Sequence, residues 1–239
     1  MPHTPLASLI RWTRTHVEMS SLVILSIVVA AVWLFAELSE EVIEGTTGTL
    51  DRHILLLLRT PGDLSNPIGP PWLEEMGRDL TALGGVAVLS LTTLVVSVFF
   101  LLMKRWTTAL YIFATVGGGI LISGIAKGAF DRPRPDLVPH GSIVHTASFP
   151  SGHSMMAAVA YLTLGVLIAR VQTRMVMKVY VMAVAVLLTI LVGISRVYMG
   201  VHWPTDVAAG WLAGGAWAMI CLIIARGFTD FRQPNHIAP

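Results

Sequence analysis

The chain has 239 residues, of which 54% are hydrophobic and only 13% are charged, and its mean hydropathy is +0.72. So little charge cannot solvate the surface of a globular protein of this size, so the composition is that of an integral membrane protein. The Lys and Arg residues are scattered and leave a net charge of only +2, which gives no support for nucleic-acid binding. The single cysteine, Cys221, excludes an intrachain disulfide.

The N-terminal part of the chain predicts an interfacial segment followed by a membrane span. Residues 1–19 mix apolar and basic side chains, as a helix lying against lipid headgroups would. Residues 20–35 carry no charge and, with their flanks, are long enough to span. A cleaved signal peptide is the competing interpretation, but no clear small-residue cleavage site precedes Glu37. We therefore expect a retained first span.

Residues 37–79 predict a long polar connection outside the membrane. It begins with several glutamates, continues with an aliphatic run over residues 54–58 and contains a Pro-rich turn over residues 67–71. The aliphatic run is too short to cross a bilayer and therefore predicts an interfacial or capping helix. Two interpretations stay open for the connection. It forms a wall over a lipid access route, or it only shields the helix ends.

Five further apolar runs predict membrane spans. They cover residues 83–103, 106–126, 154–169, 179–194 and 203–225. The predicted fold is therefore an all-α integral membrane protein, a single domain over residues 1–239 with six transmembrane helices. Glycines in the third and sixth spans, such as Gly210 and Gly214, predict close helix contacts. Most basic residues outside the polar clusters described next fall on the side of the two termini, which predicts that both termini are cytoplasmic.

Three polar clusters lie within residues 127–206, and span parity places them at one membrane face. Their charged and imidazole residues end the third and fifth predicted spans or begin the fourth and sixth. They are Lys127, Arg134, His153, Arg196, His202 and Asp206. Three cations, two imidazoles and one carboxylate meeting at one depth suit an anion with three equatorial oxygens, namely a phosphoryl group.

The same clusters resemble the three-part signature of the type 2 phosphatidic acid phosphatase superfamily. The pattern is Lys127, six residues and Arg134-Pro135, then Pro150-Ser151-Gly152-His153, then Ser195-Arg196, five residues, His202, three residues and Asp206. That superfamily includes bacterial lipid phosphatases, glucose-6-phosphatase and the vanadium haloperoxidases. The resemblance implies a phosphatase that needs no metal and no cofactor. It also implies a bacterial inner (plasma) membrane location, and the distribution of basic residues predicts that the active site faces the periplasm or exterior.

The resemblance also implies a role for each motif residue. His202 would attack phosphorus to form a phosphohistidine, and Asp206, one helical turn further on, would hold the other ring N–H. His153 would protonate the leaving oxygen and then activate water. The remaining motif residues would bind the phosphate oxygens through side chains or backbone at a helix start. They are Lys127, Arg134, Ser151, Gly152 and Arg196.

The predicted substrate is a lipid phosphate whose tails stay in the bilayer. Undecaprenyl diphosphate is placed first, followed by phosphatidylglycerol phosphate, phosphatidic acid and a lipid A phosphate. An anion or lipid transporter is the rival class, although its polar groups would be expected near mid-bilayer. A metal site formed by His140, His145 and His153 lacks a recognisable ligand pattern. Asp131 and Arg132 are interpreted as a local ion pair or as outer support for the site.

Overall fold

The computed structural model describes residues 19–136 and 147–227, which form eight helices and one pair of short antiparallel strands. The predicted N-terminal interfacial helix lies outside these residues, except for Met19. The helices are α2 (Met19–Glu44), α3 (Gly48–Leu57), α4 (Pro71–Leu83), α5 (Val86–Leu102), α6 (Trp106–Ala129), α7 (Gly152–Val171), α8 (Met175–Tyr198) and α9 (Pro204–Ala225). The strands are β1 (Arg59–Thr60) and β2 (Asp63–Pro67).

Five helices, α2 and α6 to α9, are long and apolar enough to cross a membrane. The pair α4 and α5 passes the same criterion as one broken span, with a bend of 45°. Counting this pair as one span confirms the six-span, all-α prediction. The bend lies at Gly84 and Gly85, and a Cβ atom on Gly84 would come within 2.4 Å of Val192 Cγ1. The break therefore lets the chain pass tightly against α8.

The connection between the first two spans is shorter and more ordered than the sequence predicts. Helix α2 does not end near Phe35 but continues to Glu44. Its glutamates are spaced three and four residues apart and are all exposed, so the helix carries them on one face beyond the apolar run. The predicted helix at the aliphatic run is confirmed as α3. The strand pair and α4 were not predicted, although Pro71 is at the first position of α4, where proline favours a helix start.

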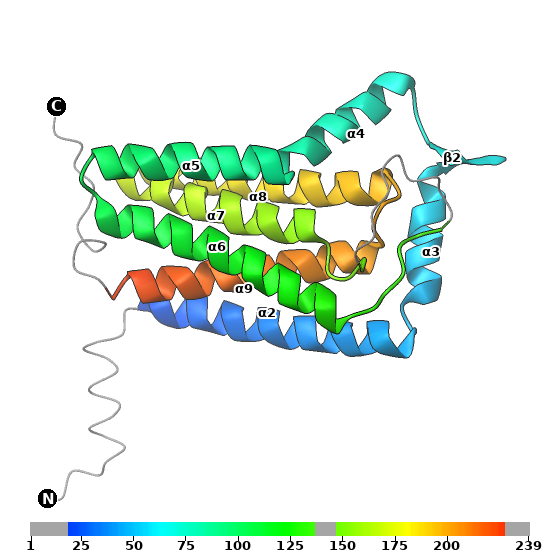
Figure 1. The fold of residues 1–239 in the computed structure, drawn as a ribbon, viewed down its shortest axis with the longest axis horizontal. Coiled ribbons are helices and arrows are strands. Elements are labelled where there is room, and N and C mark those ends of the chain that lie inside the picture. The colour runs from blue at the N-terminus through cyan, green and yellow to red at the C-terminus, as the bar shows by residue number, and fades with distance from the viewer. Residues whose placement is uncertain (1–18, 137–146, 228–239) are drawn as a thin grey trace, which may run out of the picture.

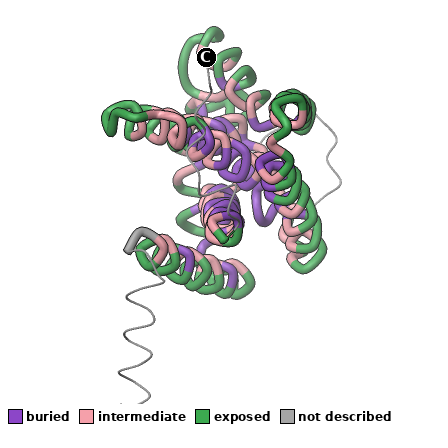
Figure 2. The backbone as a smooth tube through the Cα atoms, turned by 90° about the vertical axis from the view of Figure 1, so that its left-hand side faces the viewer, coloured by how far each residue is buried: buried purple, intermediate pink, exposed green. Residues whose placement is uncertain are grey.

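The core of the bundle lies along α7, which packs most extensively against α8 and α9. Half of the apolar window of α7 is buried, against 6% for α2, most of whose side chains are exposed. Figure 2 shows this contrast between the central and outer helices. A Cβ atom on Gly210 would meet Ser151 O at 2.7 Å, and one on Gly214 would meet Met155 O at 2.3 Å. These contacts confirm the predicted close approach at the glycines of the sixth span.

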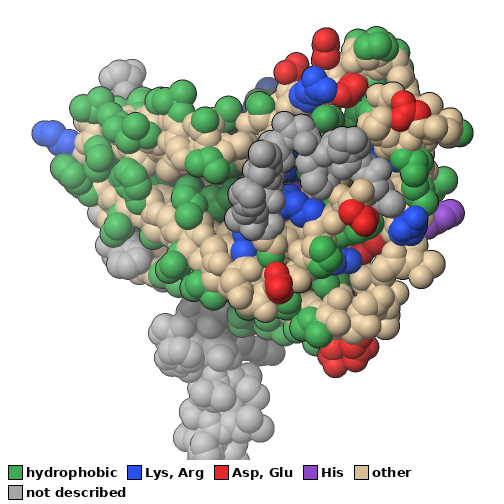
Figure 3. All heavy atoms as spheres, turned by 45° about the vertical axis from the view of Figure 1, so that its right-hand side comes forward, with side chains coloured by type: hydrophobic (Ala, Val, Ile, Leu, Met, Phe, Trp, Pro, Cys, Tyr) green, Lys and Arg blue, Asp and Glu red, His purple; other side chains and the backbone are tan. Residues whose placement is uncertain are grey.

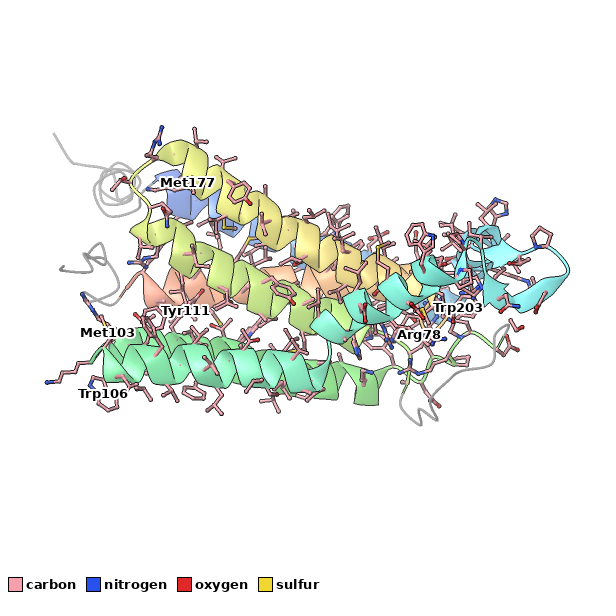
Figure 4. All side chains as sticks on the ribbon, turned by 90° about the horizontal axis from the view of Figure 1, so that it is seen from above. Arg78, Met103, Trp106, Tyr111, Met177 and Trp203 are labelled. Carbon is pink, nitrogen blue, oxygen red and sulfur yellow. The ribbon has the colours of Figure 1, made fainter. Side chains whose placement is uncertain are left out.

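The two ends of the bundle differ in charge. Helices α6 and α8 end, and α7 and α9 begin, at the end where α3 lies across the bundle (Figure 1). Charged side chains gather at this end in Figure 3, whereas much of the remaining visible face is hydrophobic or neutral. Figure 4 places Arg78 and Trp203 at this end and Met103, Trp106 and Met177 at the other. The predicted convergence of the polar clusters at one end is therefore confirmed.

Candidate active site

A cavity of about 490 Å³ opens at the charged end between α5, α6, α7 and α8. Its lining includes all of the predicted site residues except Ser151 and Asp206. The predicted site residues that line the cavity are Lys127, Arg134, Gly152, His153, Arg196 and His202. The lining contains no Asp or Glu among the described residues, whereas it includes three cations. Such a cavity favours an anionic group.

His202 lies just before α9 with only 1% of its surface exposed, and its two ring nitrogens have different partners. Its Nδ1 is 3.2 Å from Asp206 Oδ2, and its Nε2 is 3.2 Å from Arg134 Nη1. Because a guanidinium group can only donate, Nε2 is the acceptor and Nδ1 carries the proton that it donates to Asp206. This assignment leaves the lone pair on Nε2, the nitrogen on the Arg134 side of the ring.

The surroundings of His202 also favour its neutral form. Burial lowers the pKa of His202 to about 4, against an opposing effect of the Asp206 hydrogen bond and charge. The positive charges of Arg196 and Arg134 lower this pKa further. At neutral pH the imidazole is therefore uncharged, and a neutral ring nitrogen is a competent nucleophile.

Asp206 is the third residue of α9 and is completely buried. Its Oδ2 accepts the Trp203 backbone N–H at 3.0 Å, so the carboxylate caps the helix while it holds His202. Its Oδ1 accepts from Arg132 Nη1 at 2.6 Å. Both carboxylate oxygens are thus fixed, and the Nδ1 hydrogen bond sets the orientation of the His202 ring.

Arg132 bridges two carboxylates rather than forming a local ion pair. Its Nη1 binds Asp206 and its Nη2 binds Asp51 Oδ2, each at 2.6 Å. Within residues 19–136 and 147–227 no ion pair joins it to Asp131, so that part of the prediction was wrong and the outer-support interpretation holds. Sequence reasoning missed Asp51 altogether. The available signal was a carboxylate four residues before Leu55, on the apolar face of α3.

The three cations of the cavity come from different elements. Lys127 lies in the last turn of α6, with Nζ 3.5 Å from Ala147 O. Arg134 follows α6 and donates from Nη1 to Val201 O at 2.9 Å. Arg196 lies in the last turn of α8, and its buried Nε has no hydrogen-bond partner in the described part of the chain. An unsatisfied buried donor of this kind is costly unless a ligand binds it.

His153 and its neighbours form the start of α7. His153 is the second residue of the helix and lines the cavity, and none of the described residues makes a hydrogen bond to its ring. Ser151 is the N-cap, and its buried Oγ accepts from Ser154 N at 3.5 Å and from Ser154 Oγ at 3.0 Å. The Ser151 hydroxyl therefore supports the helix start rather than the cavity wall. Gly152 lies against Lys127, because a Cβ atom there would be 3.4 Å from Lys127 Cε.

The alternative metal site is not assembled by the residues that the structure describes. Among residues 19–136 and 147–227, no three His, Cys, Asp or Glu side chains gather in a way that could hold a metal ion. His140 and His145, which the alternative needs together with His153, lie outside the described residues.

A membrane-spanning helical bundle with a His and Asp pair beside a three-cation cavity defines a membrane enzyme of phosphoryl transfer. The family model of the PAP2 superfamily matches residues 107–230, more than half of the 239 residues. The chain belongs to the PAP2 superfamily, which confirms the family resemblance of its motifs. It is a multi-pass membrane protein and a phosphatase that acts on phosphoric esters of lipids.

Three known proteins show how far the likeness extends. Phosphatidylglycerophosphatase B of Bacillus subtilis is 34% identical over 174 residues, which cover 70% of this chain and 82% of the relative. Lipid A 1-phosphatase of Rhizobium johnstonii is 29% identical over 74% of this chain and 79% of the relative. The crystal structure of a transmembrane PAP2 type phosphatidylglycerolphosphate phosphatase from Bacillus subtilis has a TM-score of 0.76 and 28% identity. That match covers 86% of this chain and 98% of the other.

Proposed function

We propose that this protein removes phosphate from a membrane lipid through a phosphohistidine formed on Nε2 of His202. One observation carries the proposal. The ring of His202 is held between Asp206 at Nδ1 and Arg134 at Nε2, beside a cavity lined by three cations. This arrangement supplies a neutral nucleophile of fixed tautomer together with the charges that a phosphoryl group needs.

In the first step the lone pair of His202 Nε2 forms a bond to phosphorus while the bond from phosphorus to the lipid oxygen breaks. Protonated His153 gives its proton to that oxygen, so the lipid leaves as an alcohol, or as a lipid monophosphate when the substrate is a diphosphate. Lys127, Arg134 and Arg196 hold the equatorial oxygens as their charge redistributes. The phosphorylated ring keeps its Nδ1 proton and is cationic, and Asp206 balances that charge.

In the second step a water molecule attacks phosphorus and gives a proton to His153. The bond from Nε2 to phosphorus breaks and its electron pair returns to the ring, which releases inorganic phosphate and neutral His202. His153 is then protonated and ready for the next lipid. No step in this scheme uses a metal ion or a cofactor, and the chemistry is carried by side chains of the chain itself.

The walls of the cavity support a lipid as the carrier of the phosphate. Below the polar residues the lining changes to apolar side chains of α5, α6 and α7, including Leu89, Val116, Ile120 and Met156. A headgroup at the cations would therefore leave its first tail carbons among apolar groups that border the bilayer. A small water-soluble phosphate ester would gain nothing from these walls.

For the lipid itself we infer phosphatidylglycerol phosphate, because the relative named for that substrate aligns over 82% of its own length. This inference replaces the order that the family resemblance suggests, in which undecaprenyl diphosphate comes first. Phosphatidic acid and lipid A phosphate follow, the last supported by the Rhizobium relative.

The test is phosphate release by detergent-purified protein from these four lipids, with the His202→Ala variant as the blank. We expect the highest kcat/KM for phosphatidylglycerol phosphate and no change on adding a chelator. Faster turnover of undecaprenyl diphosphate would overturn the lipid assignment but leave the phosphatase mechanism intact. Loss of activity on chelation would overturn the metal-free mechanism.

We also propose that the cavity faces the periplasm or exterior, with both termini cytoplasmic, as the distribution of basic residues indicates. Two exposed positions at opposite ends of the bundle test this orientation, Arg52 in α3 and Thr173 in the turn between α7 and α8. In a variant lacking Cys221, Arg52→Cys should react with an impermeant thiol reagent on intact cells, and Thr173→Cys only after lysis. The opposite pattern would invert the topology.

A further inference from the structure

Asp51 is a buried carboxylate that the chemistry above does not use. It lies in α3, which crosses the end of the bundle, and only 1% of its surface is exposed. Leu55, one turn further along the same face, is fully buried and packs with Val197 and Val207 of α8 and α9. These apolar contacts hold α3 against the bundle, and Asp51 is buried on the same face of the helix as Leu55. A buried carboxylate is retained in proteins only when charged or hydrogen-bonding partners compensate it.

Three successive contacts connect Asp51 to His202, the proposed nucleophile. Its Oδ2 binds Arg132 Nη2, and Arg132 Nη1 binds Asp206, each pair at 2.6 Å. Asp206 in turn holds His202 Nδ1 at 3.2 Å. Only 13% of the Arg132 side chain is exposed, so water does little to screen these charges. The four residues form one buried chain of charge-assisted contacts from α3 to the reacting imidazole.

The charges along this chain suggest why Asp51 is present. Arg132 alone would neutralise Asp206, the carboxylate that must stabilise the ring of His202 when it becomes cationic. With Asp51 added, two carboxylates and one guanidinium leave a net charge of −1 behind the imidazole. We propose that Asp51 and Arg132 are a positioning pair, in which Arg132 fixes Asp206 and Asp51 restores the negative charge that the phosphohistidine requires. This inference rests on the proposed role of His202.

A purely structural role for Asp51 is also conceivable, and it predicts different behaviour. Asp51 Oδ1 accepts the backbone N–H of Thr205 at 3.0 Å and its Oδ2 accepts the Thr205 hydroxyl at 2.6 Å, near the start of α9. Asparagine satisfies a helix N-terminus about as well as aspartate. Asp51→Asn therefore keeps an acceptor for Thr205 and removes the charge, so it separates capping from electrostatic support.

The experiment compares Asp51→Asn, the double variant Asp51→Asn/Arg132→Gln and the control Asp63→Asn. Asp63 is an exposed carboxylate in β2 whose hydrogen-bond partners are Ser65 and Asn66. Rapid-quench measurements with ³²P-labelled lipid give the rate of phosphoenzyme formation, and steady-state assays give kcat and KM. Thermal unfolding in detergent verifies that each variant is folded.

We expect Asp51→Asn to slow phosphoenzyme formation by about 10- to 100-fold, with KM unchanged within about threefold. The double variant should be faster than Asp51→Asn, because removing both charges returns the net charge behind His202 to −1 while Trp203 N–H still holds Asp206. Asp63→Asn should match the wild type. A histidine ¹⁵N NMR spectrum should show the Nδ1–H tautomer of His202 in the wild type and in the double variant.

Two results would overturn the inference. One is wild-type phosphorylation in a folded Asp51→Asn protein. The other is a double variant slower than the single one, which is what loss of contacts from a purely structural cluster predicts. Both differ from failure of the proposed function, because in that case His202→Ala would still form a phosphoenzyme whatever residue stands at position 51.

Discussion

The two histidines lie on two sides of the cavity, and the two rings differ in their hydrogen-bond partners. On the first, the His202 side, the ring is 1% exposed and each nitrogen has a partner, backed by buried charges. On the second, the His153 side, the ring lies in the first turn of α7 and receives no hydrogen bond from the described residues. One imidazole is therefore held at both nitrogens, whereas the described residues give the other no hydrogen bond.

The difference follows from what each ring must do. A nucleophile works from a single tautomer, so rigid partners that select the Nδ1–H form increase its reactivity. An acid and base must carry a proton in one step and lose it in the other, and it must reach first the leaving oxygen and then water. Fixed partners would hinder that exchange. The contrast between the two sides supports the two proposed roles by an observation other than the order of the motifs.

Removing the charge of Asp206, which holds the His202 ring, should have the largest effect on kcat. Asp206→Asn keeps the shape of the side chain but no longer requires the Nδ1–H tautomer or balances the cationic ring. We expect kcat to fall on the order of 10³- to 10⁴-fold, with little change in KM. Steady-state assays on the preferred lipid measure this change. A loss of tenfold or less would show that the tautomer of His202 does not depend on this carboxylate.

Replacing His153 should reduce kcat less than replacing Asp206 does. The size of the reduction should depend on the leaving group of the substrate. We expect His153→Gln to lower kcat about 10²- to 10³-fold on a lipid phosphate. The loss should be smaller on p-nitrophenyl phosphate, because nitrophenolate leaves without needing a proton. Equal losses on both substrates would argue against general acid catalysis by His153 and for a role in binding.

The seam, which is the close packing between α7 and α9, holds the His153 side and the His202 side in their relative positions. A Cβ atom at Gly214 would lie 2.3 Å from Met155 O, so Gly214→Ala should push the helices apart and destabilise the fold by about 1–3 kcal/mol. Gly117→Ala in α6 is the matched control, because nothing lies within 4 Å of a Cβ atom there. Thermal unfolding in detergent should separate the two variants. An unfolding temperature for Gly214→Ala equal to that of the control would contradict the close seam.

The last expected effect concerns the dependence of stability on pH. Burial lowers the pKa of folded His202 from 6.5 to about 4, so between these values the unfolded chain binds a proton that the folded protein excludes. Stability should therefore decrease as pH falls from 6.5 towards 4. Thermal unfolding across this range should show a shallower decline for His202→Gln than for the wild type. Parallel curves would mean that His202 is not buried in its neutral form.

The membrane spans and the motif residues could be predicted from the sequence because both leave local signals. Apolar runs indicate helices that face lipid, and the parity of the predicted spans places Lys127, His153 and Arg196 at one end of the bundle. The end of α2 was misplaced because hydropathy stops at the first glutamate. Helical spacing of Glu37, Glu40 and later glutamates carried the correct signal.

The support behind the nucleophile could not be predicted, because it depends on contacts between distant parts of the chain. Asp51 and Thr205 are 154 residues apart, and no local pattern links them. Arg132 was interpreted through its neighbour Asp131, whereas the fold turns its guanidinium towards Asp51 and Asp206. Which charge a buried cation pairs with is decided by how α3 packs on the bundle.

The covalent intermediate on His202 is the central step of the proposed reaction, and one measurement tests it directly. Rapid quench of the wild type with ³²P-labelled lipid should trap an acid-labile phosphoenzyme, and peptide mapping should place the label on His202. His153→Gln should still form this species, whereas His202→Ala should form none. A labelled intermediate in His202→Ala, or a label on any other residue of the wild type, would contradict the assignment of His202 as the nucleophile.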